Sequence, residues 1–349
     1  MKRAFFYELK RNVMPLAIFA AFAVACSVVY AFTATLSYGS GTLEDSCDGM
    51  FTVLLCILCT IVPVMQFSYR MEQRSTDLWY SMPISRKNLM LVRVLSGLVL
   101  ALVPYTLAYW LGVACVAMQE SGFVFAHYLS LWAVSLPLGA GLFGVNAFLF
   151  TRANTVRDGI LFLVLWACLL PLIVATFFSG LRFKLDWDPD LPDYLNHRTG
   201  LDVASFFFPY SPAAYLSGIF DVLLRGSAVS AFSRFSLWFV LPVAVIEGVG
   251  AYVGLFLLSD RDKSENAGQI SSSWLGYRTL IPAYIVLLFG VAETLLDNSV
   301  IVYVIVALIG AALYFAYRRS FRLKKSDVIC YAASVVLGIA LALIFHYVG

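Results

Sequence analysis

Residues 89–117 read LMLVRVLSGLVLALVPYTLAYWLGVACVA and contain one charged residue, Arg93. About 20 apolar residues are enough to cross about 30 Å of hydrocarbon as an α-helix, and a helix satisfies its backbone hydrogen bonds internally. The rest of the chain is similar, because it is 61% hydrophobic and 13% charged, with a mean hydropathy of +0.84. Soluble domains carry about 45–50% apolar and about 25% charged residues. The sequence therefore predicts an all-α, polytopic helical membrane protein.

Nine apolar stretches are long enough to span a bilayer. They cover about residues 13–36, 50–68, 89–117, 127–150, 159–179, 236–258, 278–296, 299–317 and 328–348. Residues 203–226 are also apolar, but Pro209, Pro212, Asp221 and Arg225 interrupt them. A span there would move the later basic loops to the outer side, so we interpret this segment as short external or re-entrant helices.

Basic and acidic residues alternate between successive connections. The connections that we place in the cytoplasm contain Lys2, Arg3, Lys10, Arg11, Arg70, Arg74, Arg86, Lys87, Arg93, Arg152, Arg157, Arg261, Lys263, Arg278, Arg318, Arg319, Arg322, Lys324 and Lys325. The intervening connections LEDSCD, QESG and DWDPDLPD are acidic. Because Lys and Arg accumulate on the cytoplasmic side, we predict a cytoplasmic N-terminus.

The first twelve residues predict an amphipathic surface helix. Phe5, Leu9 and Val13 recur on one helical face, and charged residues including Glu8 occupy the remainder. We expect this helix to lie along the inner membrane surface. It should turn into the first span near Pro15, because proline is tolerated in the first turn of a helix.

Motifs of catalysis and metal binding are missing from the sequence. It has no G-x-x-x-x-G-K-[ST], G-x-S-x-G or H-E-x-x-H. His127, His197 and His346 lack ligand spacing, and the aspartates of residues 186–193 lack the glycine of a calcium loop. Cys56 and Cys59 form a C-x-x-C within an apolar run, where we interpret them as small apolar residues. We predict no metal site, no cofactor in this chain and no enzymatic activity of its own.

Glu247 is the one carboxylate near the middle of a predicted span. Buried charges in spans face the bundle or a wet cavity, so Glu247 is a candidate for a substrate path, with Asn146 beside it. Both residues are equally open to a structural role, such as a hydrogen bond between them. Gly250 and Gly254 form a G-x-x-x-G, which permits close helix packing.

The connection over residues 69–93 has two predicted parts. EQRSTDLWYSM, residues 72–82, predicts a short helix along the membrane surface. Pro83 stops it, and Ser85 is a suitable N-cap for the following span.

This connection resembles that of the membrane subunits of type-2 ATP-binding cassette transporters, on the motif DLWYSMPISRKNL. KRAFFYELKRN resembles the family's N-terminal connecting helix, and FFFPYSPAAYLSGIF resembles its extracellular helices. SENAG and YRRSFRLKK resemble segments of a bacterial subgroup with a C-terminal membrane extension. The resemblance implies a surface helix (1–12), a six-span permease module (13–259) with an extracellular segment (180–235), a linker (260–277) and an extension of about three spans (278–349).

The resemblance further implies a multi-pass exporter subunit of the bacterial cytoplasmic membrane that moves an amphipathic or lipid-like compound or peptide. The expected partners are an ATPase subunit, which would hold ATP and magnesium, a second permease chain and the lipid bilayer, with no nucleic acid. The ATPase subunit would dock on Asp77, Leu78, Trp79, Tyr80, Pro83, Arg86 and Lys87, with a second contact at residues 151–158. A rigid surface helix joined to two spans converts movement of a docked partner into movement of those spans.

Two other functions remain open. An ion-coupled secondary transporter predicts carboxylates in several spans and inverted repeats, whereas this sequence offers one deep carboxylate and no visible repeat. A membrane sensor or scaffold that binds an ATPase without transport is compatible with every feature above.

Overall fold

The computed structural model describes residues 2–36, 43–81, 84–119, 125–185, 231–259, 264–269, 271, 273–295 and 300–348. Across these ranges the chain forms helices and no β-strand, which confirms the predicted all-α class. Contacts divide the chain into two compact units, one of Met1–Ile160 with Pro209–Gly268 and one of Leu161–Phe208 with Gln269–Gly349. The predicted external helices of residues 203–226, the acidic loop before them and His197 lie outside the described residues.

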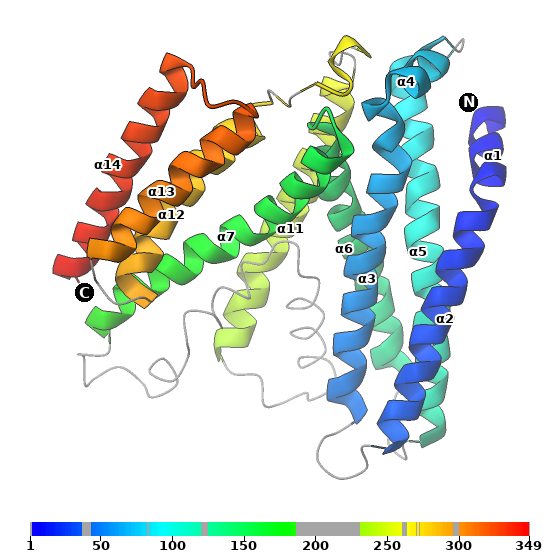
Figure 1. Cartoon of the computed structure of the whole chain (residues 1–349). Helices are drawn as coiled ribbons and strands as arrows, with labels where there is room; N and C mark the ends of the chain where they lie inside the picture. Colours follow the sequence, from blue (N-terminus) through cyan, green and yellow to red (C-terminus); the bar gives the residue numbers. More distant parts are fainter. Residues whose placement is uncertain are drawn as a thin grey trace. The chain divides into compact units, whose positions relative to one another are not determined.

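The first unit is a bundle of long helices with short helices at one end (Figure 1). Its elements are α1 (Lys2–Arg11), α2 (Val13–Leu36), α3 (Leu43–Phe67), η1 (Ser68–Met71), α4 (Gln73–Tyr80), α5 (Arg86–Gln119), α6 (Phe125–Thr151), the first turn of α7 (Val156–Leu185), α11 (Ala231–Leu258) and η2 (Ser264–Asn266). α5 packs against α2 and α3, and α6 packs against α3 and α11. Leu55, Leu58 and Phe143 are fully buried in this core.

Large apolar side chains also cover outward faces of these helices. Ile18 and Phe22 on α2 and Val103 and Leu107 on α5 are exposed, each pair one helical turn apart. In water such faces would be costly, whereas in lipid they are the normal solvent contact. Five described helices are long and apolar enough to span a membrane, or six if the bent pair α1 and α2 is one span. The chain is therefore an all-α membrane protein.

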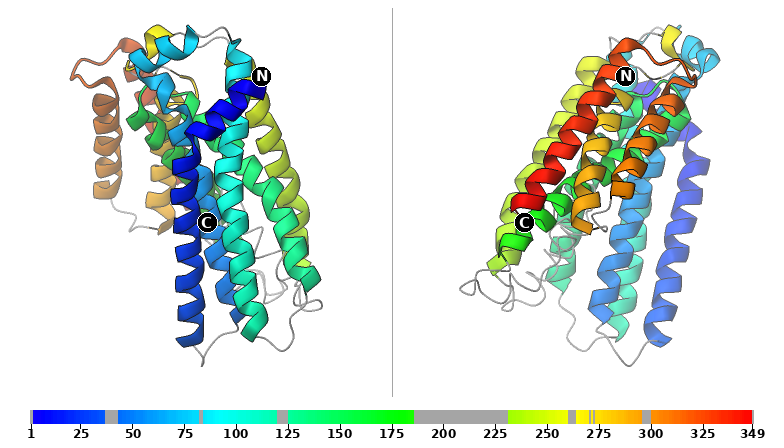
Figure 2. Two further views of the ribbon diagram at one scale, coloured as in Figure 1. Left: turned by 90° about the vertical axis from the view of Figure 1, so that its right-hand side faces the viewer. Right: turned by 60° about the vertical axis from the view of Figure 1, so that its left-hand side comes forward.

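The surface helix α1 meets α2 at an angle of 55° (Figure 2, left). The change of direction falls at Asn12, which lies between the two helices. Pro15 lies inside the first turn of α2, where its missing N–H leaves the Arg11 carbonyl without its helical donor. The turn into the first span thus falls at the predicted boundary between residues 12 and 13, close to Pro15.

Helices α6 and α11 approach most closely at two glycines. A Cβ atom on Gly248 would lie 3.1 Å from the Cα atom of Gly141, and the hydroxyl of Tyr252 donates a hydrogen bond of 2.6 Å to the carbonyl oxygen of Ala140. A Cβ on Gly254 would meet the ring of Phe148, whereas one on Gly250 would meet nothing within 4 Å. Within the chain, close packing therefore uses Gly248 and Gly254, and the predicted role of Gly250 in helix contacts stays a prediction.

The second unit contains α12 (Tyr277–Leu295), α13 (Val300–Arg318) and α14 (Lys325–Val348), together with most of α7. Ile285 and Phe289 of α12 are buried in its core. In α7, the indole of Trp166 donates a hydrogen bond of 2.8 Å to the carbonyl oxygen of Leu275. The predicted boundaries at 259 and 278 stay predictions, and the contacts group most of α7 with the last three helices.

Polar contacts hold both ends of the last three helices. The guanidinium of Arg318 makes two hydrogen bonds to the carboxylate of Asp327, of 2.6 and 2.8 Å. At the opposite end, the carboxylate of Glu293 accepts a hydrogen bond from the hydroxyl of Tyr303 and lies 2.9 Å from the Nδ1 atom of His346. Sequence reasoning treated the group around Arg318 only as a basic anchor and did not pair His346 with Glu293.

Candidate functional site

The connection between α3 and α5 has the two predicted parts. α4 occupies Gln73–Tyr80, and α5 begins at Arg86. The hydroxyl of Ser85 accepts a hydrogen bond of 3.3 Å from the backbone N–H of Asn88, which confirms Ser85 as an N-cap. Pro83, a predicted docking residue, lies outside the described residues.

The predicted docking residues separate into outward and inward groups. Asp77, Leu78, Arg86 and Lys87 are exposed, and the side chain of Leu78 has 67% of its surface accessible. Trp79 and Tyr80 are only partly exposed. An outward surface of α4 and the start of α5 is therefore available to a partner, and it contains both charge and an apolar side chain.

Trp79 packs inside the protein against two arginines. The guanidinium carbon of Arg93 lies 4.1 Å from the centre of the indole ring, and that of Arg11 lies 4.8 Å from it. A cation over an aromatic face gains about 0.5–2 kcal/mol, more when the pair is desolvated. Trp79 thus holds neighbouring helices together, a contact that the sequence did not indicate.

Arg93 is the centre of a buried cluster. The residue is only 2% exposed, and its guanidinium also lies 4.5 Å from the ring centre of Tyr69. Its Nη1 atom donates a hydrogen bond of 3.4 Å to the Oε1 atom of Gln66, and its Nη2 atom lies 3.5 Å from the carboxylate of Glu8. Sequence reasoning had assigned Arg93 only to the cytoplasmic end of a span.

Glu8 brings the surface helix α1 into this cluster. It is 2% exposed, and its carboxylate lies 3.0 Å from the Nη2 atom of Arg11. Glu8 on α1 and Asn12, directly after the helix, are therefore buried, whereas Val13 is 54% exposed. The predicted membrane-facing side of Phe5, Leu9 and Val13 stays a prediction, whereas Glu8, expected on the polar side of the helix, turns inward to pair with Arg93 on a distant helix.

We define the Arg93 cluster as Glu8, Arg11, Gln66, Tyr69, Trp79 and Arg93. Its members come from α1, the end of α3, η1, α4 and α5. Burial of two opposite charges is stable only while both are present, since removal of one leaves the other unpaired in a medium of low polarity. Trp79 and Arg93 therefore connect α4 to α5 and, through Glu8 and Arg11, to α1.

A second connection packs beside α4. The side-chain amide of Gln73 donates a hydrogen bond of 3.5 Å to the carbonyl oxygen of Ala267, in the segment SENAG. The N–H of Gly268 donates one of 2.9 Å to the carbonyl oxygen of Asn154, between α6 and α7. Gly268 has a φ of +79°, a conformation natural to glycine. The segment 264–268 is thus hydrogen-bonded both to α4 and to residues 151–158, which are the predicted second docking contact.

Asn146 and Glu247 do not interact with each other. The side-chain amide of Asn146 donates hydrogen bonds to the carbonyl oxygen of Cys59 (3.0 Å) and the hydroxyl of Thr60 (3.3 Å) on α3. Glu247, on α11, is partly exposed and has no hydrogen bond or ion pair with any described residue. Asn146 therefore stabilises the packing of α6 on α3. Of the two residues predicted for a substrate path, Glu247 remains the candidate.

The described residues contain no group of three His, Cys, Asp or Glu side chains that would hold a metal ion. Cys56 and Cys59 form no disulfide, and the thiol of Cys59 donates a hydrogen bond of 3.3 Å to the carbonyl oxygen of Gly139. This pair therefore contributes to helix packing, in agreement with its interpretation as small apolar residues.

The chain matches no protein-family model, no curated protein and no solved structure. Its functional assignment thus depends on its own residues and geometry. The most informative feature is the exposed surface of Asp77, Leu78, Arg86 and Lys87. These residues belong to α4 and α5, the helices that also carry Trp79 and Arg93 of the Arg93 cluster.

Proposed function

We propose that the chain is the membrane-spanning permease subunit of an ATP-driven exporter in a bacterial cytoplasmic membrane. A separate ATPase subunit binds the exposed surface of α4 and the start of α5. The observation that carries the proposal is that Leu78 is exposed while its neighbour Trp79 packs against Arg93. The short helix α4 thereby connects an exposed surface of the protein with the buried contacts that α1 and α5 make.

Further features agree with this function. The apolar faces of the long helices suit a polytopic membrane subunit. The nine spans and the cytoplasmic N-terminus of this proposal come from the hydropathy and charge pattern of the sequence. Two such chains, identical or related, would enclose the path for an amphipathic or lipid-like compound or a peptide. The chain's lack of a phosphate-binding loop is consistent with ATP and magnesium being held by the partner.

The other two functions predict different behaviour. An ion-coupled transporter would move substrate without ATP, and Glu247 is the one described residue near mid-span suited to ion coupling. A sensor or scaffold would bind an ATPase and move nothing. Purification of the chain from its native host and transport assays in vesicles distinguish all three. Co-purification of an ATPase and ATP-dependent transport support the proposal, whereas transport by the chain alone without ATP contradicts it.

The exposed docking surface gives the sharpest variant. Changing Leu78 to Asp together with Arg86 to Glu should weaken ATPase binding at least about tenfold, because it places a charge in an apolar contact and reverses another. Stability of the chain alone should fall by no more than about 1 kcal/mol, because both side chains are exposed and the change removes the stacking of Arg86 on the ring of Tyr80, 4.5 Å from its guanidinium carbon. Binding is measured with the purified ATPase subunit and the chain in nanodiscs.

Changes at Met118 to Asp and Arg319 to Glu serve as the matched control, because both residues are exposed and lie outside the proposed surface. Equal loss of binding in the control, or unchanged binding in the Leu78 and Arg86 variant, would remove this surface from the interface.

Glu247 is tested by its change to Gln, which removes the charge and retains the shape. If Glu247 lines the path, substrate-stimulated ATP hydrolysis should change at least about tenfold while stability changes by less than about 0.5 kcal/mol. The Asn146 to Leu variant should show the reverse pattern, with a stability loss of about 1 kcal/mol from its two lost hydrogen bonds. A loss of stability without altered turnover in the Glu247 variant would assign that residue to packing.

A further inference from the structure

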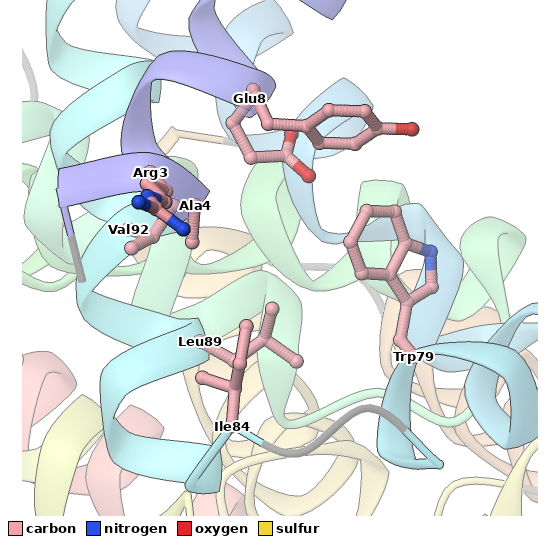
Figure 3. A pocket seen from close by; sticks show the side chains of 8 residues that line it. Arg3, Ala4, Glu8, Trp79, Ile84, Leu89 and Val92 are labelled. Carbon is pink, nitrogen blue, oxygen red and sulfur yellow. The ribbon is translucent and has the colours of Figure 1, made fainter.

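A cavity of about 450 Å³ lies between α1, α4 and the start of α5 in the first unit (Figure 3). It is lined by Arg3, Ala4, Tyr7, Glu8, Trp79, Ile84, Leu89 and Val92. Its volume falls within the range of about 300–1,000 Å³ that is typical of ligand pockets. Most of the lining is carbon, so the interior suits an apolar occupant.

The helix that forms one wall has the composition of a membrane-surface helix. α1 is bent by 55° from α2 and exposes Phe6 (65%) and Lys2, while Tyr7 (64% exposed) and Arg3 are exposed and also line the cavity. Aromatic and basic side chains together place a helix at the boundary between headgroups and acyl chains. The cavity therefore lies where lipid chains and headgroups are both within reach.

The charge around the cavity is positive. Arg3 lines the cavity itself, and Arg11 and Arg93 both stack on Trp79, which forms another part of its wall. Glu8 is the one carboxylate of the lining, and it already lies 3.0 Å from Arg11 and 3.5 Å from Arg93. Three guanidinium groups against one carboxylate leave a net positive charge for an anion at the edge.

We propose that this cavity binds one acyl chain of an anionic phospholipid, with the phosphate of its net negative headgroup held by the guanidinium of Arg3; a zwitterionic headgroup, whose phosphate is neutralised by its own cation, binds more weakly. Arginine suits this role because its planar guanidinium makes two parallel hydrogen bonds to phosphate oxygens. The bound chain would fill the space between α1 and the α4–α5 corner. The lipid thereby becomes a structural part of the corner that contains the Arg93 cluster, independently of whether the chain transports anything.

The test uses quenching of Trp79 fluorescence by lipids with brominated acyl chains. The full chain is placed in nanodiscs in which a small fraction of the lipid is brominated, with either an anionic or a zwitterionic headgroup. The contribution of Trp79 is the difference between the chain and its Trp79 to Phe variant, which separates it from the other six of the seven tryptophans. We expect about a fivefold preference for the anionic brominated lipid, as for one basic residue acting near the surface.

Three variants that retain Trp79 complete the experiment. Arg3 to Gln should abolish the preference for the anionic lipid, whereas Lys2 to Gln should retain it, because Lys2 is exposed on α1 but does not line the cavity. Ala4 to Leu should reduce Trp79 quenching by both lipids, because the larger side chain fills the cavity. Equal quenching by the two headgroups, no quenching of Trp79, or equal effects of the Arg3 and Lys2 variants would each overturn the proposal.

Discussion

Replacement of Arg93 by Leu is expected to lower the free energy of unfolding by about 3 kcal/mol or more. Arg93 is 2% exposed, and its guanidinium lies over the rings of both Tyr69 and Trp79, beside the buried carboxylate of Glu8. Without the guanidinium, Glu8 keeps only Arg11 as a partner, and a buried carboxylate with incomplete pairing is costly. Unfolding in mixed micelles, followed by tryptophan fluorescence, measures the loss.

Two further variants separate this cause from a general effect of charge removal. Lys87 to Leu removes the same charge from an exposed position of the same helix and should change stability by less than about 0.5 kcal/mol. Glu8 to Gln combined with Arg93 to Leu should cost less than the sum of the single changes, by about 1 kcal/mol or more. Strictly additive losses would show that the two side chains do not stabilise each other.

The second large effect concerns the crossing of α6 and α11. Gly248 to Ile should lower the free energy of unfolding by about 1–3 kcal/mol, the usual cost of overpacking a core. Even the first side-chain atom would lie 3.1 Å from the Cα of Gly141, and backbone cannot move aside as a flexible side chain would. The same unfolding experiment measures the loss.

Gly250 to Ile is the matched control. It introduces the same side chain into the same helix two residues away, where a Cβ meets nothing within 4 Å. Its effect on stability should be small, because the new side chain would extend into lipid, which is a favourable environment for isoleucine. Similar losses for the two variants would mean that helix α11 does not pack through Gly248.

Local signals in the sequence were sufficient to predict the helices of this protein. The long apolar runs predicted helices because a lipid-exposed backbone must satisfy its own hydrogen bonds. The break before α5 followed from local chemistry, since Ser85 accepts the hydrogen bond of an N-cap. The nine spans stay a prediction, because five described helices, or six with α1 and α2 as one span, are long and apolar enough to cross a membrane.

The sequence did not show in the same way which faces of these helices pack together. In lipid, an apolar residue gains little by being buried rather than exposed, because acyl chains are as apolar as Leu. Hydropathy therefore did not distinguish Gly248, which meets Gly141, from Gly250, which meets nothing. For the same reason, hydropathy did not indicate that the side chain of Asn146 makes its hydrogen bonds to α3 and not to Glu247.

The candidate site shows the same division. Sequence alone determined that this is an all-α membrane protein with a short polar helix between two long apolar ones, because hydropathy, proline and capping act over a few neighbouring residues. Only the tertiary structure decided that Trp79 faces inward while Leu78 faces outward, and that Glu8 and Arg93 form a buried pair. The pair joins residues far apart in the chain, and its geometry depends on how α1, α4 and α5 cross, which no local pattern specifies.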